Sequence, residues 1–102
     1  MSVLIKTTEK GKMTALLSGE IDHHVAGNIR NTIDDAVIMD KPNELILDFK
    51  DVTFMDSSGI GLVMGRYKLI TEHNGKLTVK GTSPQIKKVM KLAGLDRLAK
   101  FE

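Results

Sequence analysis

Two adjacent serines lie between an aspartate and a glycine at residues 56–59, and these side chains are the best suited in the chain to carry chemistry. An apolar run at residues 45–49 predicts a buried strand before them, and the apolar spacing of residues 62–70 predicts a helix after them. We therefore expect the serines at the amino end of a helix, where unpaired amides and the helix dipole present positive charge. Such a position favours a negative group, including a phosphate on one of the serines.

Helix capping and serine catalysis are alternatives for the same residues. Asp and Ser are preferred cap residues, but one is sufficient, and the run from Asp56 to Gly59, followed by Gly61, keeps a hydroxyl accessible. Capping stays open as an interpretation. A serine nucleophile requires a base, which His23 or His24 would have to supply. The chain has no Gly-x-Ser-x-Gly elbow and little length for a substrate cleft, so we do not expect an enzyme.

Nucleotide and metal sites are incomplete in the sequence. Gly59 and Gly61 mimic a dinucleotide-binding loop, but Met64 stands where the third glycine belongs, and no acidic residue follows at the required distance. His23 and His24 diverge by about 100° if they lie on a helix, and no cysteine or third histidine is spaced to join them. We expect no metal and no cofactor.

An aspartyl phosphate is the remaining phosphate chemistry, with Asp48, Asp51 and Asp56 as its candidates. That chemistry requires acidic residues after the first strand to hold Mg²⁺. Residues 7–12 supply only Glu9, so a serine ester is the expected product.

Composition narrows the class of protein. The chain has 102 residues, which predicts a single domain spanning residues 1–102. It contains no cysteine, signal-like segment or membrane-length apolar run, so we expect a cytoplasmic protein. Its 15 basic and 13 acidic residues are nearly balanced and aromatic residues are few, so nucleic acid is not an expected partner.

Four strands and three helices are expected, and they begin with a hairpin that turns at Gly11. The predicted strands are residues 3–8, 13–18, 44–49 and 76–80. The predicted helices are residues 23–39, a segment from near Ser58 to residue 70, and a segment from Pro84 that ends at Gly94. Asp22 and Ser83 are expected to cap the first and last helices. Asp40 to Asn43 is predicted as a turn.

This order predicts an α/β domain with a small mixed sheet, in which an N-terminal hairpin is followed by parallel strands joined through helices. The carboxyl ends of parallel strands meet at one edge of the sheet. We therefore expect three loops to lie together there, at residues 19–22, 51–58 and 81–83.

The second helix has two faces in projection. The expected core face consists of Ile60, Val63, Met64, Tyr67 and Ile70. The other face carries Leu62, Gly65, Arg66 and Leu69, which either pack against a neighbouring helix or form part of a docking surface.

Several motifs of the chain, in the same order, resemble those of the anti-sigma factor antagonists, which are members of the STAS domain family. The motifs are residues 19–24, 54–61, 65–68, 83–84 and 93–95. The resemblance is strongest to members that act on the anti-sigma-F factor of spore-forming bacteria, and it covers essentially the full chain.

The resemblance implies a regulatory protein of sporulation that is the substrate and ligand of an enzyme. In this family the anti-sigma factor is a serine kinase of the GHKL class, and the serine that it phosphorylates corresponds to Ser57. The unphosphorylated antagonist binds the anti-sigma factor and releases sigma-F, and a PP2C-type phosphatase restores this form. The alternative is a stand-alone STAS domain that senses a small molecule or nucleotide.

The expected partner-binding surface surrounds Ser57 and includes the exposed face of the following helix. Its predicted members are Glu20, Asp22, His23, His24, Asp56, Ser58, Gly59, Leu62, Arg66 and Leu69.

Overall fold

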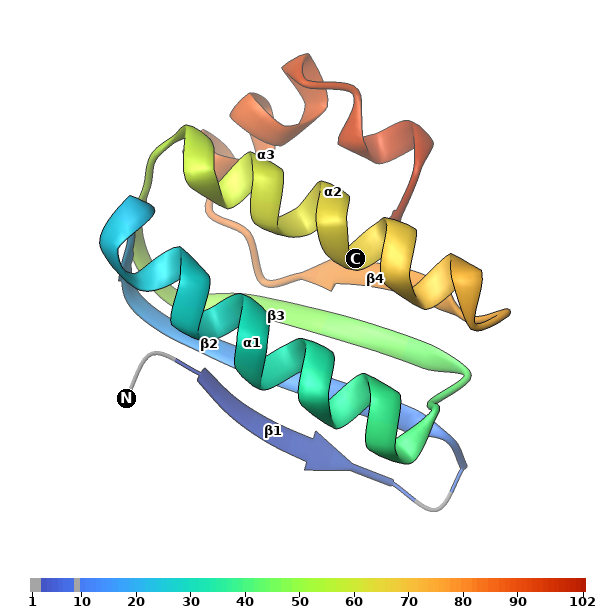
Figure 1. The fold of residues 1–102 in the computed structure, drawn as a ribbon. Coiled ribbons are helices and arrows are strands. Elements are labelled where there is room, and N and C mark those ends of the chain that lie inside the picture. The colour runs from blue at the N-terminus through green and yellow to red at the C-terminus, as the bar shows by residue number, and fades with distance from the viewer. Residues whose placement is uncertain (1–2, 9) are drawn as a thin grey trace.

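A five-stranded mixed sheet forms the centre of the computed structural model, which describes residues 3–8 and 10–102 (Figure 1). The strands are β1 (Val3–Thr7), β2 (Lys12–Ile21), β3 (Glu44–Met55), β4 (Lys76–Lys80) and β5 (Lys100–Phe101). The helical segments are α1 (His23–Asp40), α2 (Ser57–Glu72), α3 (Pro84–Leu92) and the short 3-10 helix η1 (Leu95–Arg97). The strand order is β1-β2-β3-β4-β5, with β1 antiparallel to β2 and the other neighbours parallel. The predicted fold class is thus confirmed.

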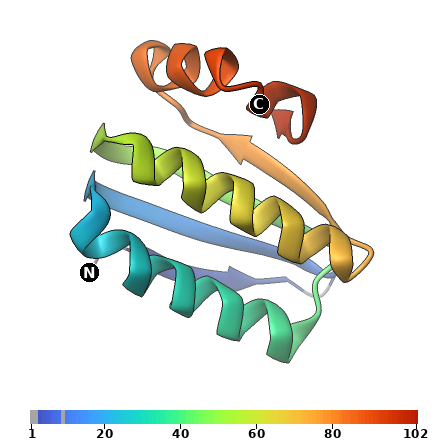
Figure 2. The same ribbon diagram turned by 45° about the horizontal axis from the view of Figure 1, so that its top comes forward.

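Helices α1 and α2 lie side by side over one face of the sheet, and α3 lies beside α2 on the side away from α1 (Figures 1 and 2). The core between these layers is one apolar cluster, which includes Ile29 and Ile33 of α1 and Leu45 and Leu47 of β3, all 0% exposed. Burying each such side chain contributes about 1.5–3 kcal/mol before the entropy of ordering it is subtracted. No helix within the described ranges is long and apolar enough to cross a lipid bilayer.

Strands β2 and β3 are longer than the sequence predicted, so two of the three expected loops are nearly absent. Pairing of β2 with β3 continues to Ile21 and Met55 through two register shifts, one of them at Gly19, whose φ is 79°. Such bulges add a residue to one strand and increase its twist without ending the pairing. The prediction that β2 ends before Gly19 and that β3 ends before Asp51 is therefore wrong.

The hairpin and the chain after α3 show two further differences of detail. Gly11 adopts a φ of 75° in the predicted hairpin turn, whereas Glu9 of that turn lies outside the described residues. Gly94, with a φ of 81°, ends α3 as predicted, but the chain then forms η1 and β5, which were not predicted. A strand of two residues has no periodicity to detect, and its stability comes from pairing with β4.

Candidate functional site

The amino ends of α1 and α2 lie next to each other because the two preceding strands end as a pair. Ile21 pairs with Met55, and the amide of Asp56 donates to the carbonyl of Ile21 at 3.0 Å. Only Asp22 separates β2 from α1, and only Asp56 separates β3 from α2. Two helix dipoles therefore direct their positive ends toward the same edge of the sheet.

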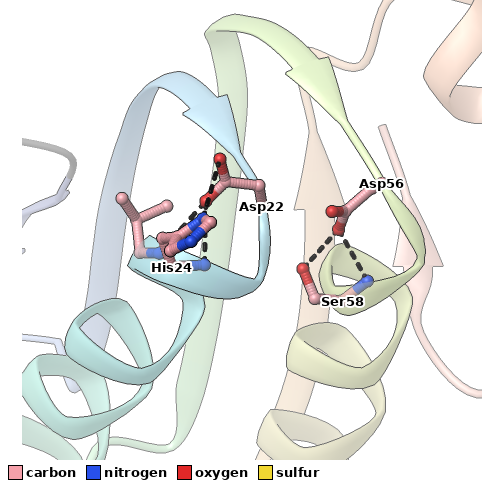
Figure 3. A network of polar contacts seen from close by, with 5 residues as sticks. Asp22, His24, Asp56 and Ser58 are labelled. Atoms are coloured by element: carbon pink, nitrogen blue, oxygen red, sulfur yellow. Dashed lines mark hydrogen bonds and ion pairs between the residues drawn. The ribbon is translucent and has the colours of Figure 1, made fainter.

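Each aspartate caps the helix that follows it (Figure 3). The Asp22 carboxylate accepts hydrogen bonds from the amides of His24 and Val25 at 2.9 and 3.2 Å, which confirms the predicted cap. The Asp56 carboxylate accepts from the amide of Ser58 at 2.9 Å and also from the Ser58 hydroxyl.

The two serines of the motif are thereby distinguished. The Ser58 hydroxyl is half-buried and donates to Asp56, so it is engaged inside the protein. Ser57 is the first residue of α2 and is exposed, and its hydroxyl has no hydrogen-bond partner anywhere in residues 3–8 and 10–102. Of the two hydroxyls, that of Ser57 is the one available to an external phosphate donor.

Asp56 adds a permanent negative charge beside Ser57. Two hydrogen bonds from Ser58 lower the pKa of Asp56 from its ordinary value of 3.8, and the bond from the Ser58 side chain has a larger effect than the bond from its backbone. Asp56 is therefore ionised at neutral pH. A second negative group on Ser57 would lie next to this charge and also at the positive end of α2.

We expect Asp56→Ala to shift the urea midpoint of unfolding downward at neutral pH, because the first turn of α2 loses its cap. A carboxylate with a lowered folded-state pKa contributes stability above its unfolded pKa, and that contribution is lost as the pH falls through the lower folded value. The difference in urea midpoint between wild type and variant should accordingly become smaller below pH 3.8. Urea titrations at neutral and acid pH measure this difference. An equal difference at both pH values would contradict the assignment of ionised Asp56 as the cap of α2.

Of the predicted docking residues, Glu20, His23 and His24 are exposed around the two caps, as a surface role requires. Gly59, which was predicted for the same surface, is buried. A Cβ on Gly59 would lie 2.1 Å from Cγ of Met55, so the glycine allows this side chain to pack against α2.

The prediction that Leu62 and Arg66 are exposed is wrong. Leu62 is 4% exposed and Arg66 is 6% exposed, because α1 lies beside α2 and covers this side of it. Leu69 is half-buried, and Met64, expected in the core, is 47% exposed. The alternative of packing against a neighbouring helix is the one that the structure adopts for Leu62 and Arg66.

Arg66 joins the two helices through an ion pair with Asp34 of α1, with 2.8 Å between Nε and Oδ1. The pair does not have the angles of a hydrogen bond, and Nη1 of Arg66 is buried without a partner among the described residues. Burial lowers the pKa of Arg66 and raises the pKa of Asp34, in each case against the attraction of the other member. Desolvation therefore outweighs the attraction in this pair.

A groove of about 500 Å³ runs between the amino-terminal halves of α1 and α2. Its lining consists of His23, Ala26, Gly27, Arg30, Ser58, Gly61, Leu62, Gly65 and Arg66. A Cβ added to Gly61 or Gly65 would meet no atom within 4 Å, so packing inside the domain does not require these glycines. They keep the groove open to the outside, a feature that helix projection alone did not reveal.

Gly61→Ala should affect stability and docking in opposite directions. The new methyl group meets no atom, and alanine is favoured over glycine in a helix, so unfolding should become harder by about 0.5–1 kcal/mol. If the groove receives a partner, the same methyl group reduces the space and weakens binding. Urea unfolding together with a titration of the partner measures both effects, and unchanged affinity would exclude Gly61 from the interface.

The fold is that of a known family. A family model described as "STAS domain" matches residues 5–102, and the chain belongs to the STAS domain family. Within it the chain is similar to the anti-sigma F factor antagonists of Paenibacillus polymyxa and Lysinibacillus sphaericus. The first is 35% identical, covering 87% of this chain and 76% of the relative, and the second is 37% identical, covering 78% and 68%.

Solved structures agree with this placement. The anti-sigma factor antagonist SpoIIAA in its unphosphorylated form superposes with a TM-score of 0.85 and 30% identity, over 98% of this chain and 87% of that one. SpoIIAA of Bacillus in its phosphorylated form superposes with a TM-score of 0.77 and 30% identity, over 98% of this chain and 90% of that one. The resemblance predicted from short motifs is thus confirmed across the chain.

Proposed function

We propose that this protein is an anti-sigma factor antagonist whose binding is switched by phosphorylation of Ser57. The observation that carries the proposal is the exposed, unengaged hydroxyl of Ser57 between two adjacent helix starts. The names of the similar proteins support it, since they are anti-sigma F factor antagonists and since SpoIIAA has been solved both with and without phosphate.

In the proposed cycle, the unphosphorylated protein binds an anti-sigma factor that is also a serine kinase of the GHKL class, and sigma-F is released. The Ser57 hydroxyl then takes the γ-phosphoryl group of ATP, ADP leaves, and the hydroxyl proton is lost. A PP2C-type phosphatase hydrolyses the ester and restores the binding form. Because the kinase uses ATP, we expect the protein to act in the cytoplasm.

The phosphate blocks binding by charge and size without a change of fold. It adds about −1.5 to −2 charges at pH 7 beside the ionised Asp56. The amino end of α2 stabilises such a group in the free protein, where water also solvates it. In a closed interface the same charge loses its water, and a cost of about 3 kcal/mol weakens binding more than a hundredfold.

The proposed docking surface is built around Ser57 at this edge of the sheet. It comprises the exposed Glu20, His23 and His24 with the caps Asp22 and Asp56 and with Ser58. The groove continues it between the helices, where Leu62 and Arg66 contribute only lining. Leu69 lies further along α2 and is a member only if the interface extends beyond the groove.

Incubation with a sporulation anti-sigma-F kinase and ATP tests the proposal. We expect the mass to increase by one phosphate, with the label at Ser57 and stable to brief acid treatment. A reaction without ATP is the control. An acid-labile label would instead place the phosphate on an aspartate. Of the three candidate aspartates, Asp48 is poorly accessible, because it is 4% exposed and accepts a hydrogen bond from the amide of Lys50.

Sensing of a small molecule is the second candidate, and the groove of about 500 Å³ between α1 and α2 favours it. It predicts no phosphate transfer and no stable complex with the anti-sigma factor. A result of that kind in the same incubation would replace the first proposal with this one.

A further inference from the structure

Helix α3 is held to the domain by one narrow face. Ser83 caps it by accepting from the amide of Ile86 at 3.2 Å, and Pro84 is its first residue. Ile86 and Met90, which are 8% and 0% exposed, enter the core. Docking of the helix therefore does not require the residues on its other sides.

One of these other sides carries a cluster of positive charge, which we call the lysine face. It is formed by Pro84, Lys87, Lys88, Lys91 and Leu92, which line a shallow depression of about 450 Å³. Leu92 is 80% exposed, and Lys88 and Lys91 are also exposed. The depression thus combines three cations with an exposed apolar side chain.

The three lysines have no ion-pair partner within residues 3–8 and 10–102. Lys12 and Lys100 do have partners, 3.8 Å away at Glu44 and 3.2 Å away at Glu102, but among the described residues single exposed lysines such as Lys50 do not, so what distinguishes the three lysines of α3 is that they cluster. Helix α3 itself contains no acidic residue. Its three positive charges exceed the formal net charge of +2 of the whole chain.

The arrangement works against the stability of α3. Lys87 and Lys91 are four residues apart, where like charges repel across one helical turn. Lys87 stands nearer the positive end of the helix, Lys88 lies at its middle, and only Lys91, in the last turn, is favoured by the dipole. Three clustered cations around an exposed leucine, with no acidic residue on their own helix and two of them repelling across one turn, fit an acidic external partner.

We propose that the lysine face of α3 is a second docking surface, which binds an acidic segment of a partner protein. Carboxylates of the segment contact the three lysines, and an apolar side chain covers Leu92 and Pro84. Helix α3 lies beside α2 on the side away from α1 (Figures 1 and 2), and its depression shares no lining residue with the groove between α1 and α2. The inference goes beyond the switch at Ser57 and does not depend on it.

Two features favour a protein segment over a membrane or a nucleic acid. A helix that binds in a bilayer presents a continuous apolar face, but Ile86 and Met90 of α3 are already buried in the domain. Binding of a single-stranded nucleic acid relies on aromatic stacking as well as charge, and α3 has no aromatic residue, while the phosphate backbone of a duplex offers no apolar group to cover Leu92. A hollow with cations around an exposed leucine instead fits acidic side chains around an apolar one.

The probe is a synthetic helical peptide with glutamates around a central leucine, titrated into the ¹⁵N-labelled full chain. We expect amide shifts centred on residues 84–92 and an affinity that falls as salt increases. The triple variant Lys87→Gln, Lys88→Gln, Lys91→Gln should raise Kd by about tenfold or more. Replacing the central leucine of the peptide by serine should weaken binding several-fold.

The matched control is Lys50→Gln, Lys68→Gln, Lys76→Gln, which removes three exposed lysines and the same charge from other elements. It should leave Kd within about twofold, since screening at physiological salt limits distant charges. Equal losses in both triple variants, or shifts that map away from α3, would overturn the proposal. So would binding to phosphatidylserine vesicles that needs these lysines while the peptide fails to bind.

Discussion

Ser57→Ala should fold as the wild type does, bind the anti-sigma factor and accept no phosphate. The Ser57 side chain is exposed and has no hydrogen-bond partner among the described residues, so its removal costs the fold almost nothing. The hydroxyl is nevertheless the proposed acceptor, and alanine has no oxygen to phosphorylate. We therefore expect a complete loss of labelling together with an unchanged melting temperature.

The neighbouring serine supplies the matched control. Ser58→Ala removes the hydroxyl that donates to Asp56, so it should loosen the first turn of α2 slightly while Ser57 still accepts phosphate. Ser57→Asp adds one charge beside Asp56 and should weaken binding by about tenfold or more. Kinase labelling and native-gel binding of the three variants measure these effects. Full labelling of Ser57→Ala, or its loss only in Ser58→Ala, would assign the switch to the other serine.

Arg66→Ala should lower the free energy of unfolding by about 2–3 kcal/mol, the largest effect on stability expected near the site. The substitution removes a side chain that is 7% exposed and leaves the carboxylate of Asp34 beside the vacated space. Because Asp34 keeps 27% of its side chain exposed, water relieves part of that cost. The loss should therefore fall below the roughly 3–5 kcal/mol that is typical of broken, fully buried pairs.

Comparison with Arg66→Met separates packing from charge. Methionine retains most of the volume, so the variant should lose less than Arg66→Ala, and adding Asp34→Leu should restore near-wild-type stability. The pKa directions support this, since burial opposes the charged form of both groups. Urea unfolding of the wild type, Arg66→Met, Asp34→Leu and the double variant forms a double-mutant cycle. If Arg66→Met keeps full stability and loses partner binding, Arg66 is a docking residue and not a link between α1 and α2.

Local signals in the sequence were enough to predict the types and order of the elements from β1 to α3, and the motif at Ser57. Asp22 and Ser83 cap their helices because a short polar side chain satisfies amides only two or three residues away. The alternation in β4 and the apolar spacing in α1 are equally local, and both elements form where they were predicted. Each of these features depends on a few consecutive residues, so neighbours in sequence are sufficient to specify it.

The tertiary structure decided which faces are buried and how far the strands extend. Leu62 and Arg66 are buried because α1 packs along α2. The residues of α2 alone do not indicate which element packs against this face. Likewise β3 continues to Met55 because the bulged β2 stays paired with it, although its last residues read as a loop. The adjacent helix starts around Ser57 follow from this pairing. Burial and pairing depend on residues far apart in the chain, so only the folded arrangement determines them.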